Sequence, residues 1–417
     1  MRVLQITKTS EASFWAVRQA AHLAKHGVEV HAVLPATTGA AVAAWQASGA
    51  TLHFLDCSLP VRKPATVLKR ASQLRDLIEA IQPDLIHTHH VTTTTMLRFA
   101  LGRKHSIPRL FQVPGPLHLE HWHTRRFEIA LAGENDFWIA SSRFIMQLYE
   151  NAGVAAKKLF LSYYTTDTTS FSNVRTGYLR HKLGIPENAL VMGNISFIYP
   201  PKRYLGHTLG LKCHEDIIEA IRIVQRHRND IWGVLAGGTF GSSDKYERRL
   251  RALAKQKGNG KILMPGKLSS QEVAWSWPDF DCAVHVPLSE NCGGVVEPLL
   301  AGVPTIAGNV GGLPEVVQRG LTGELVPTHS PELLAEAVFK LLDHYDEFRQ
   351  MAKQGRQLAT VMFDSERCSN EILAIYRHLL FNEFRPLAFD SRNFLVSSQA
   401  LHLTNSDPAL RLADAVC

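Results

Sequence analysis

Short apolar runs alternate with amphipathic stretches through most of the chain. The run Val3–Ile6 is followed by a helical pattern over 14–26, which Gly27 is expected to end as a C-cap. Short runs separated by helical patterns are typical of parallel strands that are covered by helices on both faces of a sheet. Further strands are predicted over 28–34, 52–55, 84–89, 109–113 and 137–140, with helices over 65–81, 93–105 and 143–152.

The same alternation starts again near residue 189. Strands are predicted over 189–195, 232–238, 262–266, 282–286 and 304–307, and helices over 214–227, 245–257, 295–301, 314–319, 331–343 and 346–360. We therefore predict an α/β protein with two doubly wound, Rossmann-like domains, 1–170 and 171–364. A C-terminal helix over 365–381 follows, and no structure is assigned to the tail 382–417. Ligands of such sheets bind beyond the carboxyl ends of the strands.

The composition excludes several classes of protein. The 417 residues are 45% apolar and 20% charged, which is ordinary for a globular chain and unlike a disordered or collagen-like one. No apolar run reaches the ~20 residues of a membrane span, and the N-terminal residues lack the apolar stretch of a signal peptide. The six cysteines are scattered without a CxxC pair, so we expect reduced thiols in a cytoplasmic protein.

The positive charge is concentrated in the first part of the chain. The net charge is +7, and residues 1–170 hold 18 basic against 12 acidic side chains. This excess fits an anionic lipid surface or a phosphate-bearing ligand, or it is ordinary solvated charge. No zinc finger, RNP motif or basic leucine zipper accompanies it, so nucleic acid is not an expected partner.

A glycine-rich segment, Ser289–Pro304, follows one of the predicted strands and opens a helix. The pair Gly293–Gly294 lets the backbone approach a ligand closely, and the free amides of a helix start favour an anion. Glu297 falls in the first helical turn, where a carboxylate suits the helix dipole. A second glycine-rich turn, Gly308–Glu315, comes one strand later. The alternative is a pair of ordinary strand-to-helix turns without a ligand.

This segment resembles the donor-site signature of the retaining GT-B glycosyltransferases of family 4, which has two glutamates followed by LAGVP and GGLPEVV. Three further motifs resemble the same family: PDLIHTH at 83–89, TTDTTSF at 165–171 and LKCHED at 211–216. The similarity covers about residues 1–380. It implies the GT-B fold, in which two Rossmann-like domains face each other across a cleft.

The resemblance implies a role for each matching residue. Glu297 corresponds to the glutamate that holds the donor ribose, Glu290 to the one beside the sugar ring, and Lys212 to the lysine that neutralises the diphosphate. His118 resembles a histidine near the reacting sugar. Backbone contacts to the sugar, the phosphates and the base are implied for Asn291, Cys292, Gly293, Gly294, Val295, Gly237, Gly238, Gly266 and Lys267.

Two departures from the family pattern affect these assignments. The family places one residue more between its glutamates than the six that separate Glu290 from Glu297, so a strict count puts Ser289 at the first position. We favour Glu290, because a loop absorbs a deletion more readily than a helix. The arginine that usually precedes the lysine is absent. Lys202 and Arg203, in an insertion upstream of Lys212, are candidates for the second positive charge, with an ordinary basic loop as the alternative.

The histidines do not suggest a metal. His87 and His89 form an HxH pattern, and His118, His121 and His123 form HxxHxH, neither of which matches a closed zinc site. We therefore predict no metal and no cofactor. His285, on an apolar strand, is expected to be a core histidine with its hydrogen bonds satisfied.

Together these features predict a retaining hexosyltransferase that moves a sugar from a nucleotide-sugar donor to a glycan or lipid-linked acceptor. The expected setting is cell-surface polysaccharide or glycolipid biosynthesis in the cytoplasm, with peripheral contact at the inner face of the cell membrane. Two alternatives remain open: a nucleotide-sugar epimerase of the same architecture, and a non-catalytic subunit that binds nucleotide sugar. A nicotinamide dehydrogenase is disfavoured, because GxGxxG is missing after the first strand.

Overall fold

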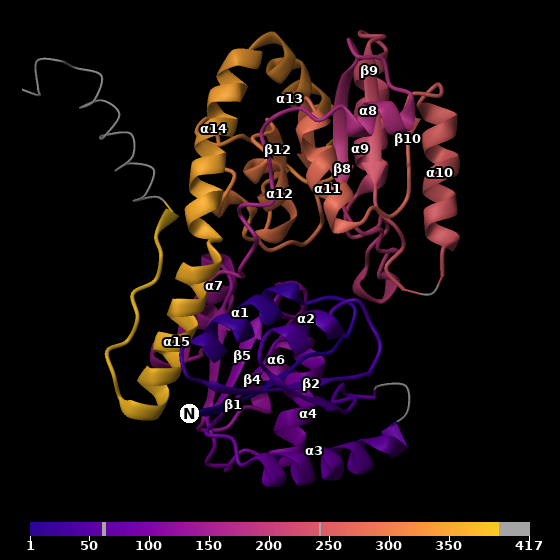
Figure 1. The fold of residues 1–417 in the computed structure, drawn as a ribbon. Helices are drawn as coiled ribbons and strands as arrows, with labels where there is room; N and C mark the ends of the chain where they lie inside the picture. The colour runs from indigo at the N-terminus through magenta and orange to yellow at the C-terminus, as the bar shows by residue number, and fades with distance from the viewer. Residues whose placement is uncertain (61–63, 242, 392–417) are drawn as a thin grey trace, which may run out of the picture. The chain divides into compact units, whose positions relative to one another are not determined.

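The computed structural model describes residues 1–60, 64–241 and 243–391 and divides into two compact units (Figure 1). The first unit comprises Met1–Thr168, Ser289–Gly293 and Phe363–Ala388; the second comprises the described residues of Thr169–Leu288, together with Gly294–Met362 and the last described residues 389–391. Each unit has its own parallel sheet with helices on its faces, which confirms the predicted α/β fold with two doubly wound, Rossmann-like parts.

The first sheet has seven strands in the order β3-β2-β1-β4-β5-β6-β7. β1 lies in its interior and pairs in parallel with β2 on one side and β4 on the other, so that Gln5 is opposite both Ala32 and His87. The strands are β1 (Arg2–Ile6), β2 (Glu29–Leu34), β3 (Thr51–Phe54), β4 (Leu85–Thr88), β5 (Arg109–Val113), β6 (Asp136–Ala140) and β7 (Leu159–Leu161).

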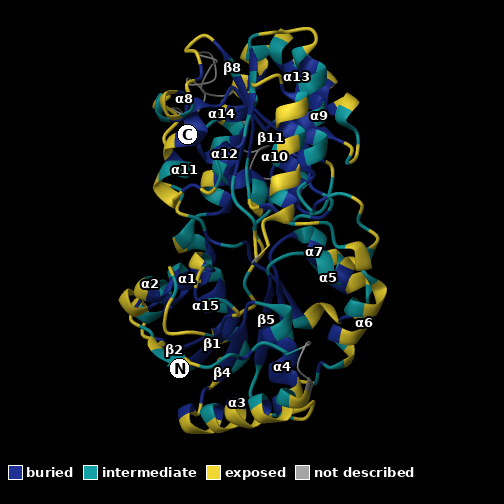
Figure 2. Ribbon diagram, turned by 90° about the vertical axis from the view of Figure 1, so that its right-hand side faces the viewer, coloured by how far each residue is buried: buried dark blue, intermediate teal, exposed yellow. Residues whose placement is uncertain are grey.

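Alternate residues of these strands build two cores, because successive side chains of a strand point to opposite faces. Val3 and Leu85 pack with the helices α1, α2 and α15, whereas Leu4 and Ile86 pack with α3 and α4. Figure 2 shows the strands buried and the outer sides of the helices exposed. The helices are α1 (Phe14–Lys25), α2 (Val42–Ala47), α3 (Val67–Ile81), α4 (Val91–Leu101), α5 (Leu117–Glu120), α6 (Trp122–Ala130), α7 (Arg143–Asn151) and α15 (Ser365–Phe381).

The second sheet has six strands in the order β10-β9-β8-β11-β12-β13. They are β8 (Leu190–Ile195), β9 (Ile231–Ala236), β10 (Ile262–Leu263), β11 (Cys282–His285), β12 (Thr305–Gly308) and β13 (Glu324–Val326). One buried core joins β8, β11 and β12 to α9, α10 and α13. The helices are α8 (Tyr178–Leu183), α9 (His214–Gln225), α10 (Lys245–Lys257), α11 (Ser270–Ser276), α12 (Val296–Leu300), α13 (Pro331–Asp343) and α14 (Tyr345–Met362).

The long helices and strands lie where the apolar pattern predicts them. The differences between the predicted and the observed structure are in short elements. The C-cap of α1 is His26, so the predicted C-cap Gly27 stands one position further on, where its φ of +78° is the left-handed conformation that favours glycine after a helix. The predicted helix over 314–319 is wrong: it is a single 3-10 turn, Leu313–Glu315. Its continuation is replaced by a loop in which the Thr322 hydroxyl donates to Val316 O and accepts from Gln318 N. Among the described residues, no helix combines the length and the apolar character needed to cross a membrane.

Candidate donor site

The carboxyl ends of β8, β9 and β10 bring together the glycines that the sequence singled out. Gly237 follows β9, and its N–H donates to Gly266 O over 2.8 Å. A Cβ on Gly237 would lie 1.9 Å from Ser196 O, and its φ of +131° is one that other residues rarely adopt. Only glycine therefore fits this strand end. Gly238 faces Lys267, whose Cβ would lie 3.3 Å from a Cβ built on the glycine.

The turn into α12 is shaped by a buried histidine of β11. A Cβ on Gly294 would lie 2.0 Å from His285 Nε2, so this position also requires glycine. His285 is 2% exposed, and its Nδ1 lies 3.0 Å from Nδ2 of Asn194 on β8. This confirms that His285 is a hydrogen-bonded core histidine. The imidazole of His285 also packs against the glycine turn at Gly294. The position of His285 on an apolar strand did not indicate this second role.

Glu297 stands in the first turn of α12. Its Oε2 accepts a hydrogen bond from the Trp277 indole Nε1 over 3.1 Å. Burial raises the pKa of Glu297, and the indole donor opposes that rise. A carboxylate in a partly desolvated place is a strong acceptor for hydroxyl groups of a ligand. Trp277 comes from a different part of the chain, and no motif pointed to it.

Lys212 lies directly before α9, in a loop that is tied to the end of β11. Leu288 N donates to the neighbouring Leu211 O over 2.9 Å. Cys213, which stands where the family motif has glycine, has φ +49°. The left-handed conformation explains why glycine suits this position in the motif. The next residue, His214, is buried; burial, with smaller effects from His285 and Lys212, lowers its pKa to about 3, so its imidazole is neutral.

The insertion upstream of Lys212 forms a short 3-10 turn, Arg203–Leu205, and Arg203 is exposed at its start. Lys202 directly precedes this turn and is partly buried. The loop ends at Gly210, whose N–H donates to the Tyr246 hydroxyl over 2.9 Å. A Cβ on Gly210 would lie 2.4 Å from that hydroxyl, so only glycine allows the loop to approach Tyr246 this closely.

The segment Ser289–Gly293 belongs to the first unit, unlike the helix that follows it. Asn291 Nδ2 donates to Ser141 Oγ over 2.8 Å and to Ser141 O over 3.3 Å. Glu290 Oε1 accepts from the Asn291 backbone N–H over 3.0 Å. Cys292 is also buried, whereas Gly293 is exposed. The two glutamates of the motif therefore belong to different units.

The histidine that resembles a family residue near the sugar, His118, lies on α5. Its Nε2 is 3.4 Å from the Tyr149 hydroxyl, and burial lowers its pKa, so the imidazole is neutral near pH 7. His87 is also buried, and its Nδ1 lies 2.6 Å from the Tyr376 hydroxyl on α15. Among the described residues, these histidines take part in no group with metal-ligand geometry.

Two models of known protein families match this chain, one in each of its two parts. Residues 15–163 match the model of the "Glycosyl transferase 4-like domain", and residues 204–358 match "Glycosyl transferases group 1". A D-inositol 3-phosphate glycosyltransferase from a Nocardioides species is 25% identical over 332 residues, which cover 72% of this chain and 69% of that protein.

Solved structures share the fold over most of the chain. Anabaena Alr3699/HepE, solved in complex with UDP and glucose, has a TM-score of 0.75 at 18% identity and covers 90% of this chain and 99% of its own. Sucrose-phosphate synthase from Thermosynechococcus elongatus has a TM-score of 0.74 at 18% identity, covering 92% of this chain and 100% of its own. At these identities the similarity establishes the fold.

Proposed function

Because this chain belongs to the GT-B glycosyltransferases of family 4, we propose that it is a retaining enzyme that transfers a sugar from a nucleotide-sugar donor to a glycan or lipid-linked acceptor. The observation that carries this proposal is the glycine-lined end of the second sheet, with Glu297 at the start of α12. The proposed setting is polysaccharide or glycolipid biosynthesis in the cytoplasm, without a cofactor in the transfer reaction.

The proposed donor site assigns each group a task that suits its chemistry. The Glu297 carboxylate accepts hydrogen bonds from the two ribose hydroxyls. The departing nucleoside diphosphate gains negative charge as the glycosidic bond breaks, so groups that meet this charge stabilise the transition state most. Lys212 supplies a positive charge there, and backbone amides at Gly238, Gly294 and Val295 supply hydrogen-bond donors. Front-face displacement, the usual proposal for the family, needs no protein nucleophile.

The relatives support a choice of donor and acceptor for testing. The Anabaena structure holds UDP and glucose, so we propose a uridine diphosphate sugar as the donor. The Nocardioides relative is named for an inositol phosphate acceptor. An acceptor with a phosphate also suits the 18 basic against 12 acidic side chains of residues 1–170.

The direct test is a panel of UDP-, GDP- and TDP-sugars incubated with the full chain, with sugar release and transfer followed by NMR. We expect one nucleotide class to be consumed and the transferred sugar to keep its anomeric configuration. Glu297→Gln replaces one acceptor oxygen by a donor amide and should weaken donor binding by ~1–3 kcal/mol. The exposed Glu336→Gln on α13 is the matched control.

Three outcomes would contradict the proposal. Conversion of the donor into an epimer without any acceptor would make the protein an epimerase. Binding without turnover on any acceptor would favour a non-catalytic subunit. Calorimetry that gives wild-type donor affinity for a folded Glu297→Gln protein would remove Glu297 from the ribose site.

A second prediction concerns the first glutamate of the motif. We expect Glu290→Ala to lower kcat by ~10²-fold or more, the scale of losing one transition-state contact, and Ser289→Ala to lower it much less. The contacts support this choice, because Ser289 hydrogen-bonds the carboxyl group of Glu120. Steady-state kinetics of both variants, with circular dichroism as a folding control, decides the alignment. A greater loss of kcat in Ser289→Ala than in Glu290→Ala would place Ser289, and not Glu290, at the position of the first glutamate.

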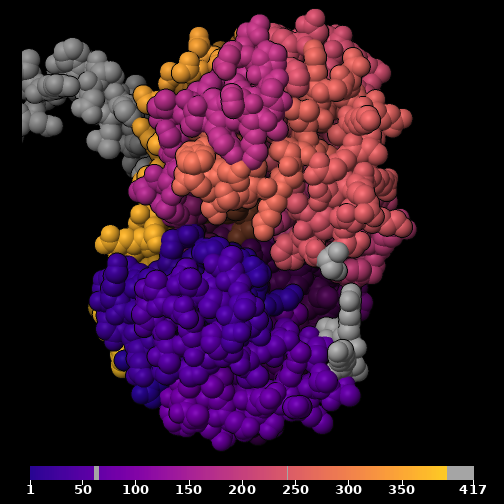
Figure 3. All heavy atoms as spheres, turned by 45° about the vertical axis from the view of Figure 1, so that its right-hand side comes forward, coloured from indigo at the N-terminus to yellow at the C-terminus, as the bar shows by residue number. Residues whose placement is uncertain are grey.

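The exposed side of α3 is the proposed membrane-facing surface of the first unit. The violet part of the chain, to which α3 belongs, lies at the surface in the space-filling view (Figure 3), and Lys69 and Arg75 of α3 are exposed. Arg70 is less available, because its guanidinium lies 2.7 Å from Asp56 Oδ2. Arg62 and Lys63, also part of this basic stretch, lie outside the described residues.

We expect the chain to co-sediment with vesicles rich in anionic lipid at low salt and to be released by salt. Lys69→Glu should weaken this binding by ~1–2 kcal/mol, since each basic residue near a charged surface contributes about 1 kcal/mol. Lys255→Glu, the same change at an exposed lysine on α10 of the second unit, should have no effect. Vesicle binding that does not depend on salt, or equal effects of Lys69→Glu and Lys255→Glu, would show that the exposed side of α3 is an ordinary solvated surface.

A further inference from the structure

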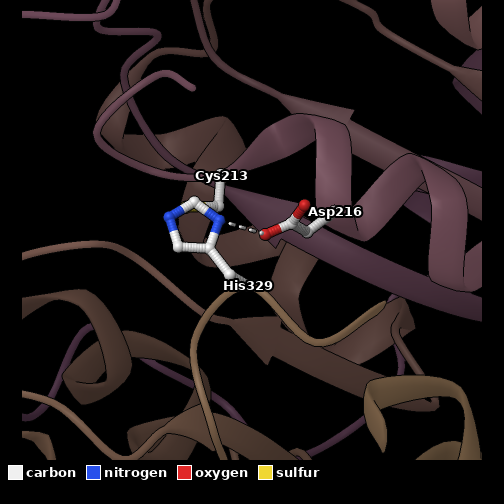
Figure 4. Close-up of side chains that lie close together, drawn as sticks. All are labelled: Cys213, Asp216 and His329. Atoms are coloured by element: carbon white, nitrogen blue, oxygen red, sulfur yellow. Dashed lines mark ion pairs between the residues drawn. The ribbon is translucent and has the colours of Figure 1, made fainter. Parts of the chain in front are cut away.

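Three potential metal ligands lie together in the second unit. The sulfur of Cys213, a nitrogen of His329 and an oxygen of Asp216 are all within 4.8 Å of one another. Figure 4 shows the imidazole of His329 and the carboxylate of Asp216 side by side, with Cys213 next to them. Cys213 directly precedes α9 and Asp216 is in its first turn, whereas His329 comes from the loop between β13 and α13.

The contacts inside the group leave coordinating atoms available. Asp216 Oδ2 is buried and accepts no hydrogen bond from the described residues; its ion-pair contact with His329 Nδ1 is 3.5 Å long. That distance is too long for a hydrogen bond of normal strength. Cys213 is buried, and the His329 side chain is 47% exposed, so the group opens toward solvent on the histidine side.

The geometry requires only a small movement to surround an ion. In a tetrahedral zinc site with bonds of about 2.0–2.3 Å, neighbouring ligand atoms lie roughly 3.3–3.8 Å apart. The three atoms of this group lie within 4.8 Å of one another, so each pair needs to approach by at most about 1.5 Å. Cys213 and Asp216 are held at the start of α9, so rotation of the half-exposed His329 side chain is the movement that is needed.

The charges around the group favour a cation. Burial is the main cause of the raised pKa of Asp216, and the nearby carboxylates of Glu215 and Glu332 add to the rise. The positive end of the α9 dipole and the neighbouring Lys212 disfavour a cation, and the negative charges of the carboxylates counteract both. Thiolate, imidazole and carboxylate are all ligands that zinc accepts, and a soft thiolate disfavours magnesium and calcium.

We propose that Cys213, Asp216 and His329 bind one zinc ion, with water in the fourth position. The Cys213 thiol loses its proton to solvent when the Zn–S bond forms, and no electron transfer is involved. The ion ties the start of α9 to the loop after β13, two segments that are more than one hundred residues apart. Its predicted role is to stabilise the second unit, and it is independent of the proposed donor chemistry.

Cobalt(II) is the probe of choice, because its spectrum reports both sulfur ligation and coordination geometry. The full chain, freed of metal with a chelator, should bind one Co²⁺ per chain with a thiolate charge-transfer band and intense tetrahedral d–d bands, and Zn²⁺ should abolish both. Affinity for Zn²⁺ should fall at least ~10–100-fold in Cys213→Ser, Asp216→Asn and His329→Asn. Cys57→Ser and His344→Asn, which change a buried thiol and an ion-paired histidine elsewhere, should bind as wild type.

His329→Asn is the decisive variant, because asparagine tolerates the φ of +56° found at this exposed loop position and the protein should fold. Zn²⁺ should raise the Tm of the wild-type chain and leave that of His329→Asn unchanged. Absence of a thiolate band, octahedral Co²⁺, or wild-type affinity in these three variants would overturn the proposal. None of these measurements uses glycosyl transfer, so their failure would leave the proposed enzymatic function untouched.

Discussion

Replacing Lys212 by alanine is expected to lower kcat by ~10²–10³-fold, with a much smaller rise in KM. The physical reason is that the charge on the departing diphosphate grows during bond cleavage, so a cation at this point stabilises the transition state more than the bound donor. Lys212 follows Leu211, whose carbonyl is held by Leu288 N over 2.9 Å, and it directly precedes the left-handed Cys213 at the start of α9.

Steady-state kinetics with the identified donor gives kcat and KM separately. Lys212→Arg keeps the charge and should recover part of the rate, whereas Lys257→Ala, which removes a surface ion pair with Glu219, should leave kcat unchanged. If Lys212→Ala leaves both kcat and KM unchanged, the phosphate charge would be assigned to Lys202 and Arg203 instead. A parallel rise in KM and fall in kcat/KM at constant kcat would indicate ordinary donor binding.

Replacing Arg98 by methionine is expected to destabilise the first unit by ~3–5 kcal/mol. Arg98 on α4 is 2% exposed, and its Nε donates to Asp136 Oδ1 over 2.9 Å. Its Nη1 bonds the Glu128 carboxylate and also the Glu128 backbone carbonyl, the latter over 2.8 Å. Glu128 and Asp136 are each 1% exposed, so the loss of Arg98 leaves buried carboxylate charge that the remaining Arg109 does not balance.

Urea denaturation followed by circular dichroism measures this loss. Arg75→Met removes an arginine of α3 that makes one 3.1 Å hydrogen bond to Ala100 O, and it should cost less than about 1 kcal/mol. Adding Glu128→Gln to Arg98→Met should restore part of the stability, because it removes one of the uncompensated charges. Equal effects of Arg98→Met and Arg75→Met would show that the buried network does not stabilise the unit.

The long strands and helices could be predicted because their signal is local. Val3–Ile6, followed by an amphipathic stretch that Gly27 ends, contains within some 25 residues the information that places β1 and α1. Short elements such as α2, α6 and β13 were not predicted, since a few residues carry too little periodicity to identify them. Their formation depends on neighbours in space.

Residue types at fixed spacings also suggested the family and the candidate donor residues before any contact was known. Glu297, Gly294 and Lys212 were singled out as candidates in this way, whereas the neighbours of Glu297 and Gly294 were not. Trp277 donates to Glu297, and His285 fills the space that makes Gly294 necessary. These partners come from elements without a motif of their own.

The tertiary structure alone decided which distant segments lie together. It places Ser289–Gly293 with the first unit and α15 against α1, and it brings His329 next to Cys213 and Asp216. Periodicity and motifs act over a few helical turns or one strand, so they specify what each segment becomes. Contacts between segments separated by a hundred residues depend on how sheets and helices pack, and only the folded chain determines them.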